Sequence, residues 1–155
     1  MRSRRWPAIG PSLPMSSPDA AARGAARHGR PFGGHEGDPL AVARAGEYIA
    51  EHGSLALSII TRYEILRGLK AKNATTQVQA FDHFCEACRI LPLTDEVVVR
   101  AAEIYAALKQ RGEPIGDADI LIGASALAHG LTVVTNNEDH FKRIPGLQVA
   151  NWLRP

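Results

Sequence analysis

The sequence lacks several features on which common classes of protein depend. Its formal net charge of +2 is small, so charge alone neither requires nor excludes a nucleic-acid partner. No apolar run approaches the length of about 20 residues that a membrane-spanning helix needs. The only cysteines are Cys85 and Cys88, and a zinc site would need two further ligands at matching spacing. We therefore expect a soluble protein of the reduced cytoplasm, without membrane contact and with both cysteines on a helix face.

Residues 1–37 differ in composition from the rest of the chain. Acidic residues occur there only at Asp19 and Glu36, and Arg, Ala, Gly, Pro and Ser dominate. Such a segment cannot bury enough apolar area to offset the entropy lost on ordering it. Three interpretations are open: a flexible tail, an organellar transit peptide, which is typically rich in Arg and Ser and poor in acids, or an incorrectly assigned start. We treat it as an atypical extension ahead of one domain at 38–155.

Residues 38–155 have the length of one domain and alternate between helical and strand patterns. Apolar positions recur at helical spacing in five segments, and short apolar runs separate several of them. Helices are expected over 39–53, 61–72 (capped by Thr61), 75–88, 95–111 (capped by Thr94) and 117–129, and strands over 55–60, 90–93, 131–134 and 147–152. This alternation predicts an α/β fold with a mostly parallel sheet covered by helices on both faces.

The segment 114–141, PIGDADILIGASALAHGLTVVTNNEDHF, places polar groups at a helix start and just beyond a buried strand. Asp117 and Asp119 open its helix, and the strand stops abruptly at the Thr-Asn-Asn of residues 135–137. In open α/β sheets, ligands bind in the crevice beyond the carboxyl ends of the strands. These side chains would meet carboxylates from neighbouring strand-helix junctions there, which is the layout of a divalent-metal site.

Glu64 is expected in the first turn of an earlier helix that also follows a strand, so acids recur at two strand-helix junctions. Each acid alone has a structural interpretation, because the unpaired N–H groups and the dipole at a helix start favour negative charge. That interpretation is favoured for Asp117 as an N-cap, while Asp139 suits either a cap or a ligand. Residues 135–137 also suit an ordinary polar turn. For His140, a local hydrogen bond or solvent exposure is favoured over a ligand role.

Oxygen ligands without cysteine or paired histidines favour Mg²⁺ or Mn²⁺ over zinc. The blocks SIITRYEILRG, PIGDADILIGASALAHGLTVVTNNEDHF and IPGLQVANW resemble, in order and spacing, the body of a PIN-domain ribonuclease, and specifically the VapC-like toxin of a bacterial type II toxin-antitoxin pair. The resemblance covers residues 38–152. It implies a three-layer α/β/α domain that binds one or two Mg²⁺ ions, hydrolyses RNA, forms a homodimer and is covered by a cognate antitoxin.

On this resemblance, Glu64 is the second acid of the site and Asp119 the third. Asn137 stands at the fourth position, where such toxins often carry Asn in place of Asp. These three are the expected catalytic residues and metal ligands, with Asp117 as a weaker ligand. The supporting residues are Thr135, Asn136 and Asp139. Basic side chains on the Glu64 helix suit the RNA backbone, although a solvated helix face is the favoured interpretation. They are Arg62, Arg67, Lys70 and Lys72.

The sequence departs from the resemblance at its beginning. The family opens with an apolar strand that ends in a metal-binding Asp, and neither Asp19 nor Asp38 follows an apolar run. A matched body joined to an unrelated beginning favours the wrong-start interpretation of residues 1–37. Two functions are therefore expected: a metal-dependent endoribonuclease, or a catalytically impaired remnant that still binds an antitoxin. A nucleotide-binding module is disfavoured, because Gly116 and Gly123 lack the spacing of a phosphate loop.

Overall fold

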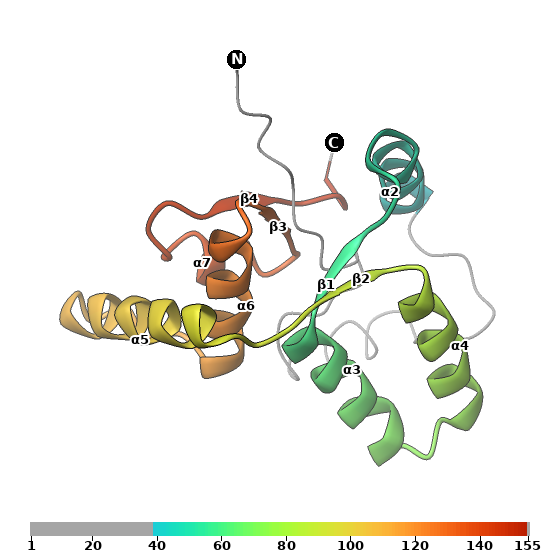
Figure 1. Ribbon diagram of the computed structural model, residues 1–155, viewed down its shortest axis with the longest axis horizontal. Helices are drawn as coiled ribbons and strands as arrows, with labels where there is room; N and C mark the ends of the chain where they lie inside the picture. The colour runs from blue at the N-terminus through green and yellow to red at the C-terminus, as the bar shows by residue number, and fades with distance from the viewer. Residues whose placement is uncertain (1–38, 155) are drawn as a thin grey trace.

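The computed structural model describes residues 39–154, so the extension predicted at 1–37 and the domain start at Asp38 lie outside the described residues (Figure 1). No helix within residues 39–154 is long and apolar enough to cross a membrane. The elements in chain order are α2 (Pro39–His52), β1 (Ala56–Ser58), α3 (Ile59–Ala71), α4 (Thr75–Glu86), β2 (Arg89–Leu91), α5 (Asp95–Gln110), α6 (Asp117–Ala128), β3 (Thr132–Val134), α7 (Glu138–Phe141) and β4 (Gln148–Ala150).

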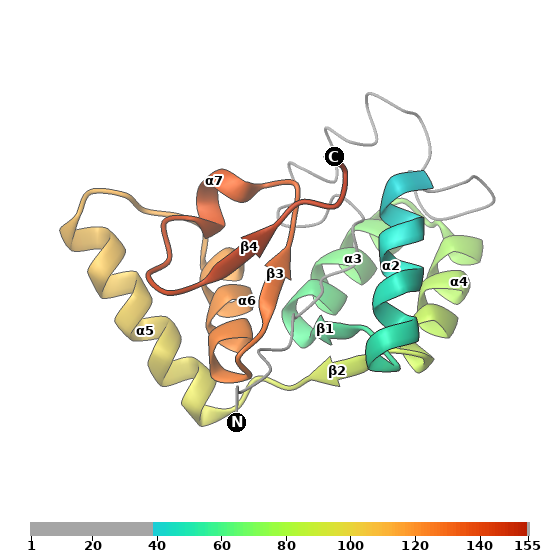
Figure 2. The same ribbon diagram turned by 90° about the horizontal axis from the view of Figure 1, so that it is seen from above.

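The strands form two parallel pairs. β1 pairs with β2 so that Leu57 lies opposite Ile90, and β3 pairs with β4 so that Val133 lies opposite Val149. Figure 2 shows the β3–β4 pair on the side of α5, α6 and α7, and the β1–β2 pair on the side of α2, α3 and α4. The predicted α/β class with parallel strands is confirmed. Among residues 39–154, however, the strands form two sheets rather than one, because no described strand joins β1 to β3.

Helix α6 lies at the centre of the largest apolar cluster. Its residues Ile120 and Ala124 pack in one cluster with Ile104 of α5 and with Val133 of β3. A side chain at Gly123 would collide with the end of Ile144, so glycine lets the segment after α7 pack directly on α6. Because α6 is buried over much of its length, packing from several directions fixes the position of its first turn.

The start of α3 differs from the sequence-based expectation. The strand predicted over 55–60 ends at Ser58, whose hydroxyl accepts a hydrogen bond from the Ile60 N–H at 3.2 Å and caps the helix. Thr61, the predicted cap, is buried inside α3. A serine in extended backbone is as good a cap as threonine, so the helix begins three residues early. As a result, Glu64 lies in the second turn of α3 and not in the first.

The start of α6 also corrects an expectation. Gly116 occupies the N-cap, so Asp117 is the first helical residue and not the cap. Thr94 does cap α5 as predicted, because its hydroxyl accepts a hydrogen bond from the Val97 N–H at 3.3 Å. The interpretation of Asp117 as an N-cap is therefore wrong, although the site of helix initiation is right.

The two cysteines are free thiols near the end of α4. Cys85 is buried on that helix as expected, whereas Cys88 follows the helix, which ends at Glu86. Burial raises the pKa of both thiols, that of Cys88 to about 11. Neither thiol is therefore activated as a thiolate at neutral pH.

Candidate active site

Asp119 is the most buried acid in the described part of the chain. It lies in the first turn of α6, and its side chain is only 3% exposed. Its Oδ2 accepts a hydrogen bond from Nδ1 of His140 at 2.7 Å, whereas its Oδ1 is buried without a hydrogen-bond partner. Burial raises the pKa of Asp119, and the contact with His140 opposes that rise. The carboxylate is thus held by one oxygen and leaves the other available.

Glu64 brings a second carboxylate into the same region. Its Oε2 is also buried without a partner among the described residues. Burial raises the pKa of Glu64 to about 7, the negative charge of Asp119 adds to the rise, and Arg67 opposes it. Helix α3, which carries Glu64, also contacts α6, which carries Asp119. Two acids from separate helices therefore lie close enough to repel each other.

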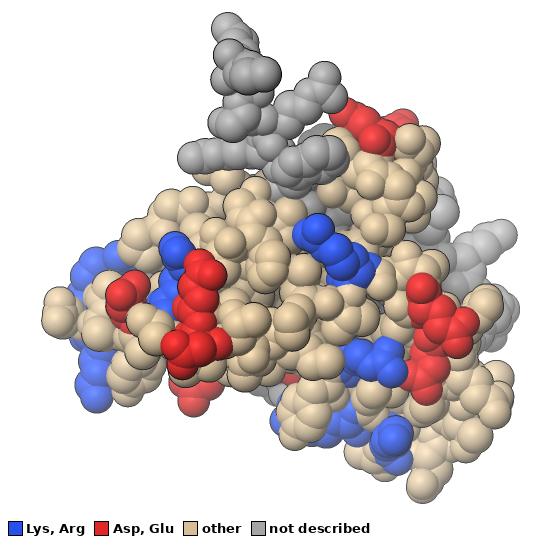
Figure 3. Space-filling view, viewed as in Figure 1, with Lys and Arg blue, Asp and Glu red and all other residues tan. Residues whose placement is uncertain are grey.

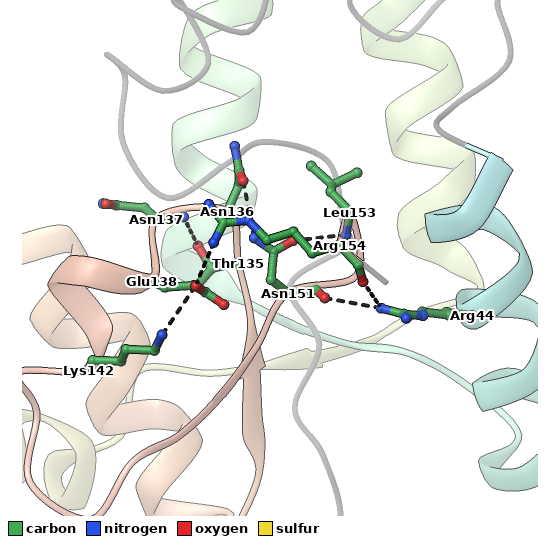
Figure 4. Close-up of polar contacts among 9 residues, drawn as sticks. All are labelled: Arg44, Thr135, Asn136, Asn137, Glu138, Lys142, Asn151, Leu153 and Arg154. Carbon is green, nitrogen blue, oxygen red and sulfur yellow. Dashed lines mark hydrogen bonds and ion pairs between the residues drawn. The ribbon is translucent and has the colours of Figure 1, made fainter.

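A different arrangement holds the polar side chains beyond β3 and β4 (Figure 4). The Thr135 hydroxyl accepts a hydrogen bond from the Asn137 N–H at 3.0 Å, and Oδ1 of Asn136 accepts one from the Asn151 side chain at 3.2 Å. Glu138 forms ion pairs with Lys142 at 3.2 Å and with Arg154 at 3.5 Å. We call these residues, Thr135, Asn136, Glu138, Lys142, Asn151 and Arg154, the strand-end network.

Helix α2 is tied to the same end of the chain. Nη1 of Arg44 donates hydrogen bonds to the carbonyl oxygens of Asn151 at 3.1 Å and of Arg154 at 2.7 Å. The rings of Tyr48 and Trp152 lie 6.1 Å apart between centroids. The first described helix is thereby fixed to the last described residues.

Comparison with known proteins places this geometry in a family. A family model described as the PIN domain matches residues 33–147. The chain belongs to the PIN-domain family. The predicted membership of the PIN-domain family and the predicted three-layer α/β class are thereby confirmed. Within residues 39–154, the two strand pairs form the β-structure of this fold.

Named relatives and solved structures agree with this PIN-domain assignment. The chain is 34% identical over 107 residues to Ribonuclease VapC2 from Rickettsia felis, covering 68% of this chain and 80% of the relative. It is 30% identical over 99 residues to the tRNA(fMet)-specific endonuclease VapC from Salmonella typhimurium, covering 63% and 75%. The structure of VapBC2 from Rickettsia felis bound to a promoter DNA fragment has a TM-score of 0.66 and 31% identity, covering 73% and 85%. FitAcB from Neisseria gonorrhoeae has a TM-score of 0.67 and 27% identity, covering 77% and 89%.

The acid pair of this PIN domain fits a hard divalent cation. Mg²⁺ and Mn²⁺ prefer carboxylate oxygens, and the pair offers two buried oxygens that have no other described partner. A cation between Glu64 and Asp119 would offset both their burial and their mutual repulsion. Within residues 39–154, no group of three or more His, Cys, Asp or Glu is placed to hold a metal. The described residues therefore offer only this pair of acids to such a cation.

The other predicted ligands, Asp117 and Asn137, and the predicted supporting residues Asn136 and Asp139 differ from this pair in exposure or in their contacts. Asp117 and Asp139 are exposed in the first turns of α6 and α7. The Asn137 side chain extends away from the other labelled side chains in Figure 4, while its backbone N–H is held by Thr135. Asn136 is engaged with Asn151. The roles of these four residues at the metal stay predictions.

The four basic residues predicted to contact RNA, three in α3 and Lys72 directly after it, divide into two groups. Arg62 forms an ion pair with Asp82 of α4 at 2.8 Å, which occupies its guanidinium. Arg67, Lys70 and Lys72 are exposed, and Figure 3 shows Lys and Arg over the part of the surface that α3 forms. The Arg67 guanidinium lies 5.3 Å from the centroid of the Tyr63 ring. Only the second group is free to meet a polyanion.

Two features of the site escape sequence reasoning. A local hydrogen bond or solvent exposure was expected for His140, whereas the structure joins it to Asp119, 21 positions away, and no local pattern indicates that partner. Tyr63 is 58% exposed beside Arg67, and an isolated tyrosine in a helix carries no sequence signal of such a position. The contact between His140 and Asp119 depends on how α6 and α7 are packed.

Proposed function

We propose that this PIN domain is a Mg²⁺-dependent endoribonuclease of a toxin-antitoxin pair, in which Glu64 and Asp119 hold the metal ion. The observation that carries the proposal is the pair of buried carboxylate oxygens without described partners, contributed by two different helices. Burying charge without a partner is costly, and a cation is the partner that hard oxygens select. The named ribonuclease relatives support the same reaction class.

The reaction follows from the chemistry of the two acids. Mg²⁺, when bound, lowers the pKa of a water and stabilises charge on the phosphate oxygens. A carboxylate of the acid pair accepts the proton of the attacking water. The water oxygen bonds to phosphorus and the bond from phosphorus to the 3′ oxygen breaks. The products are a 5′-phosphate and a 3′-hydroxyl, which takes its proton from solvent.

The RNA backbone runs along the exposed side of α3 in this proposal. Arg67 is the central contact, because it lies on the helix of Glu64 and its charge acts on that carboxylate. Lys70 and Lys72 extend the positive surface toward the end of the helix. Arg62 is assigned to structure and not to RNA, since Asp82 occupies it.

The expected partners are RNA, a cognate antitoxin that covers the acidic site, and a second copy of the chain. The similarity to the structure of VapBC2 from Rickettsia felis supports a protein partner for this chain. A small reading frame immediately upstream that encodes a DNA-binding protein is the genetic arrangement that this role requires.

The alternative is an impaired remnant that binds an antitoxin without cutting RNA, and it rests on the sequence, in which neither Asp19 nor Asp38 follows an apolar run. Within residues 39–154, no third acid joins Glu64 and Asp119, and no strand lies between β1 and β3. The family resemblance assigns both missing parts to a first strand that ends in Asp. We therefore expect full cleavage only when such a strand is present ahead of Asp38.

The decisive experiment compares RNA cleavage by two proteins in Mg²⁺ and in EDTA. One is the chain as it stands, and the other carries an apolar strand ending in Asp ahead of Asp38. We expect weak or no cleavage from the first and Mg²⁺-dependent cleavage from the second, abolished by Glu64→Gln or Asp119→Asn. Full activity of the present chain that is lost in the same two variants contradicts the need for the strand and supports the acid pair. Cleavage that survives both substitutions contradicts the proposed site.

A further inference from the structure

Within residues 39–154, His140 is the side chain that forms a hydrogen bond with an acid of the proposed site. Its Nδ1 lies 2.7 Å from Oδ2 of Asp119, and the His140 side chain is 39% exposed whereas Asp119 is 3% exposed. The next residue, Phe141, is fully buried and anchors the short helix α7 against the core. The imidazole is therefore held in place by its own backbone and reaches the buried carboxylate from the solvent side.

The two oxygens of Asp119 have different surroundings. Oδ2 is held by His140, and Oδ1 is buried without a described partner. The χ2 torsion of an aspartate has a broad distribution, so a carboxylate without a hydrogen bond rotates easily. Either of its oxygens can then face the metal ion. One hydrogen bond to Oδ2 removes that freedom and fixes where Oδ1 lies. Groups behind a metal ligand commonly orient it in this way.

We infer that His140 is a positioning residue that holds the Asp119 carboxylate so that Oδ1 is presented to the metal ion. The inference rests on the proposed function, because it assumes a cation between Glu64 and Asp119. It adds that the exposed imidazole acts on Asp119 and does not itself bind the cation, because the nitrogen nearest the site is the one that donates the hydrogen bond. The proton of a neutral His140 is therefore on Nδ1.

The first measurement needs no metal. Long-range proton–nitrogen NMR spectra of the full chain in EDTA report which imidazole nitrogen of His140 carries the proton. We expect the Nδ1–H form, and we expect Asp119→Ala to remove that preference. A His140 ring protonated on Nε2 alone overturns the inference, whatever the protein does with metals or RNA.

The second measurement is the affinity of the full chain for Mn²⁺ by isothermal titration calorimetry. Loss of an orienting group costs about 10- to 100-fold in metal affinity, so we expect that loss in His140→Ala. His140→Asn, whose amide also donates a hydrogen bond, is expected to restore most of the affinity. The matched control is His83→Ala, since His83 contacts Glu86 at 3.2 Å on the exposed surface of α4, and its Mn²⁺ affinity should equal that of the parent.

The outcomes separate the inference from the proposed function. Equal Mn²⁺ affinity in the parent and in folded His140→Ala overturns the positioning role while the metal site stands. Absence of Mn²⁺ binding by the parent, with His140 still in the Nδ1–H form, contradicts the metal site itself and with it the role assigned to His140. If His140→Ala does not fold, the comparison of His140→Asn with His140→Leu under the same titration decides, because leucine fills the space without donating.

Discussion

Two sets of polar groups, the acid pair and the strand-end network, meet their hydrogen-bonding needs in opposite ways. Glu64 and Asp119 each keep one buried oxygen without a described partner. In the network, the Asn136 and Glu138 side chains have partners from the same set. The Thr135 hydroxyl accepts a hydrogen bond from the backbone N–H of Asn137. Polar groups that satisfy one another stabilise a fold, whereas unsatisfied buried charge costs stability. The difference agrees with the proposed metal-binding role of the acid pair and with a structural role of the network.

The largest expected effect is on metal binding. Asp119→Asn or Glu64→Gln each removes a charged ligand, so Mn²⁺ affinity should fall by about 100-fold or more, which corresponds to about 2.7 kcal/mol. Asn151→Ala disturbs the strand-end network and should change Mn²⁺ affinity less than about threefold. Calorimetric titration of the three variants checks this. Equal losses in all three would erase the distinction between the two sets.

Within the network, the Thr135 hydroxyl should matter most for stability. Thr135→Val removes the acceptor of the Asn137 N–H in a buried position and should lower the free energy of unfolding by about 1 to 2 kcal/mol. The matched control is Thr132→Val, the same exchange on a partly exposed residue of β3, with an expected change below about 0.5 kcal/mol. Urea denaturation measures both. Identical free energies of unfolding for the two variants would show that the hydrogen bond to the Thr135 hydroxyl does not stabilise the fold.

The acid pair should instead make stability fall as the pH rises. The pKa of Glu64 is raised from its ordinary 4.5 to about 7, so the folded protein binds this proton more tightly than the unfolded chain does. Stability is then highest below pH 4.5 and declines until the pH passes about 7. The loss is about 1 to 2 kcal/mol, reduced because the carboxyl is partly exposed.

Thermal unfolding in EDTA at a series of pH values tests this dependence in Glu64→Gln. The quantity to compare is the difference in stability between the variant and the parent at each pH. Other charged or titratable groups face the same region, and their effects largely cancel in this difference: Asp119 from α6, Arg67 from α3 and His140 from α7. We expect the variant to gain stability relative to the parent above pH 7 and to show no gain at pH 4. A constant difference across this range would mean that Glu64 titrates normally.

The smallest effect is expected at the exposed rim of the network. Lys142→Ala removes one of two cations paired with Glu138, and Arg154 remains. Exposed pairs contribute about 0 to 0.5 kcal/mol, so unfolding in urea should barely change. A loss above about 1 kcal/mol would show that the network is more tightly coupled than its exposure indicates.

Local chemistry made much of the fold predictable. Thr94 caps a helix because a hydroxyl precedes a helical pattern, and β3 stops at Thr135 as the polar residues predict. The start of α3 was placed too late, because Ile59 and Ile60 are β-branched and favour a strand when taken alone. Packing of α3 and the Ser58 cap outweigh that preference.

Only part of the candidate site could be predicted from the sequence. Glu64 and Asp119 were expected together from their places after strands, and the rise that the Asp119 charge causes in the pKa of Glu64 agrees with that expectation. The contacts that distinguish Asp119 from Asp117, and Arg67 from Arg62, join residues about 20 positions apart in different helices. Such contacts follow from how helices pack, and no periodicity within one helix encodes them.

Helix α2 also sets the order in which the chain can assemble. Its anchors are the last described residues, since Arg44 bonds to the Asn151 carbonyl across 107 positions. At ribosomal rates those residues emerge about 5 to 20 seconds after Arg44 does. Tyr48 of the helix also packs in a cluster with Leu55, which emerges early, but closing the long loop to Asn151 is slow. The contacts of Arg44 with this segment therefore form only after the residues up to Arg154 have emerged.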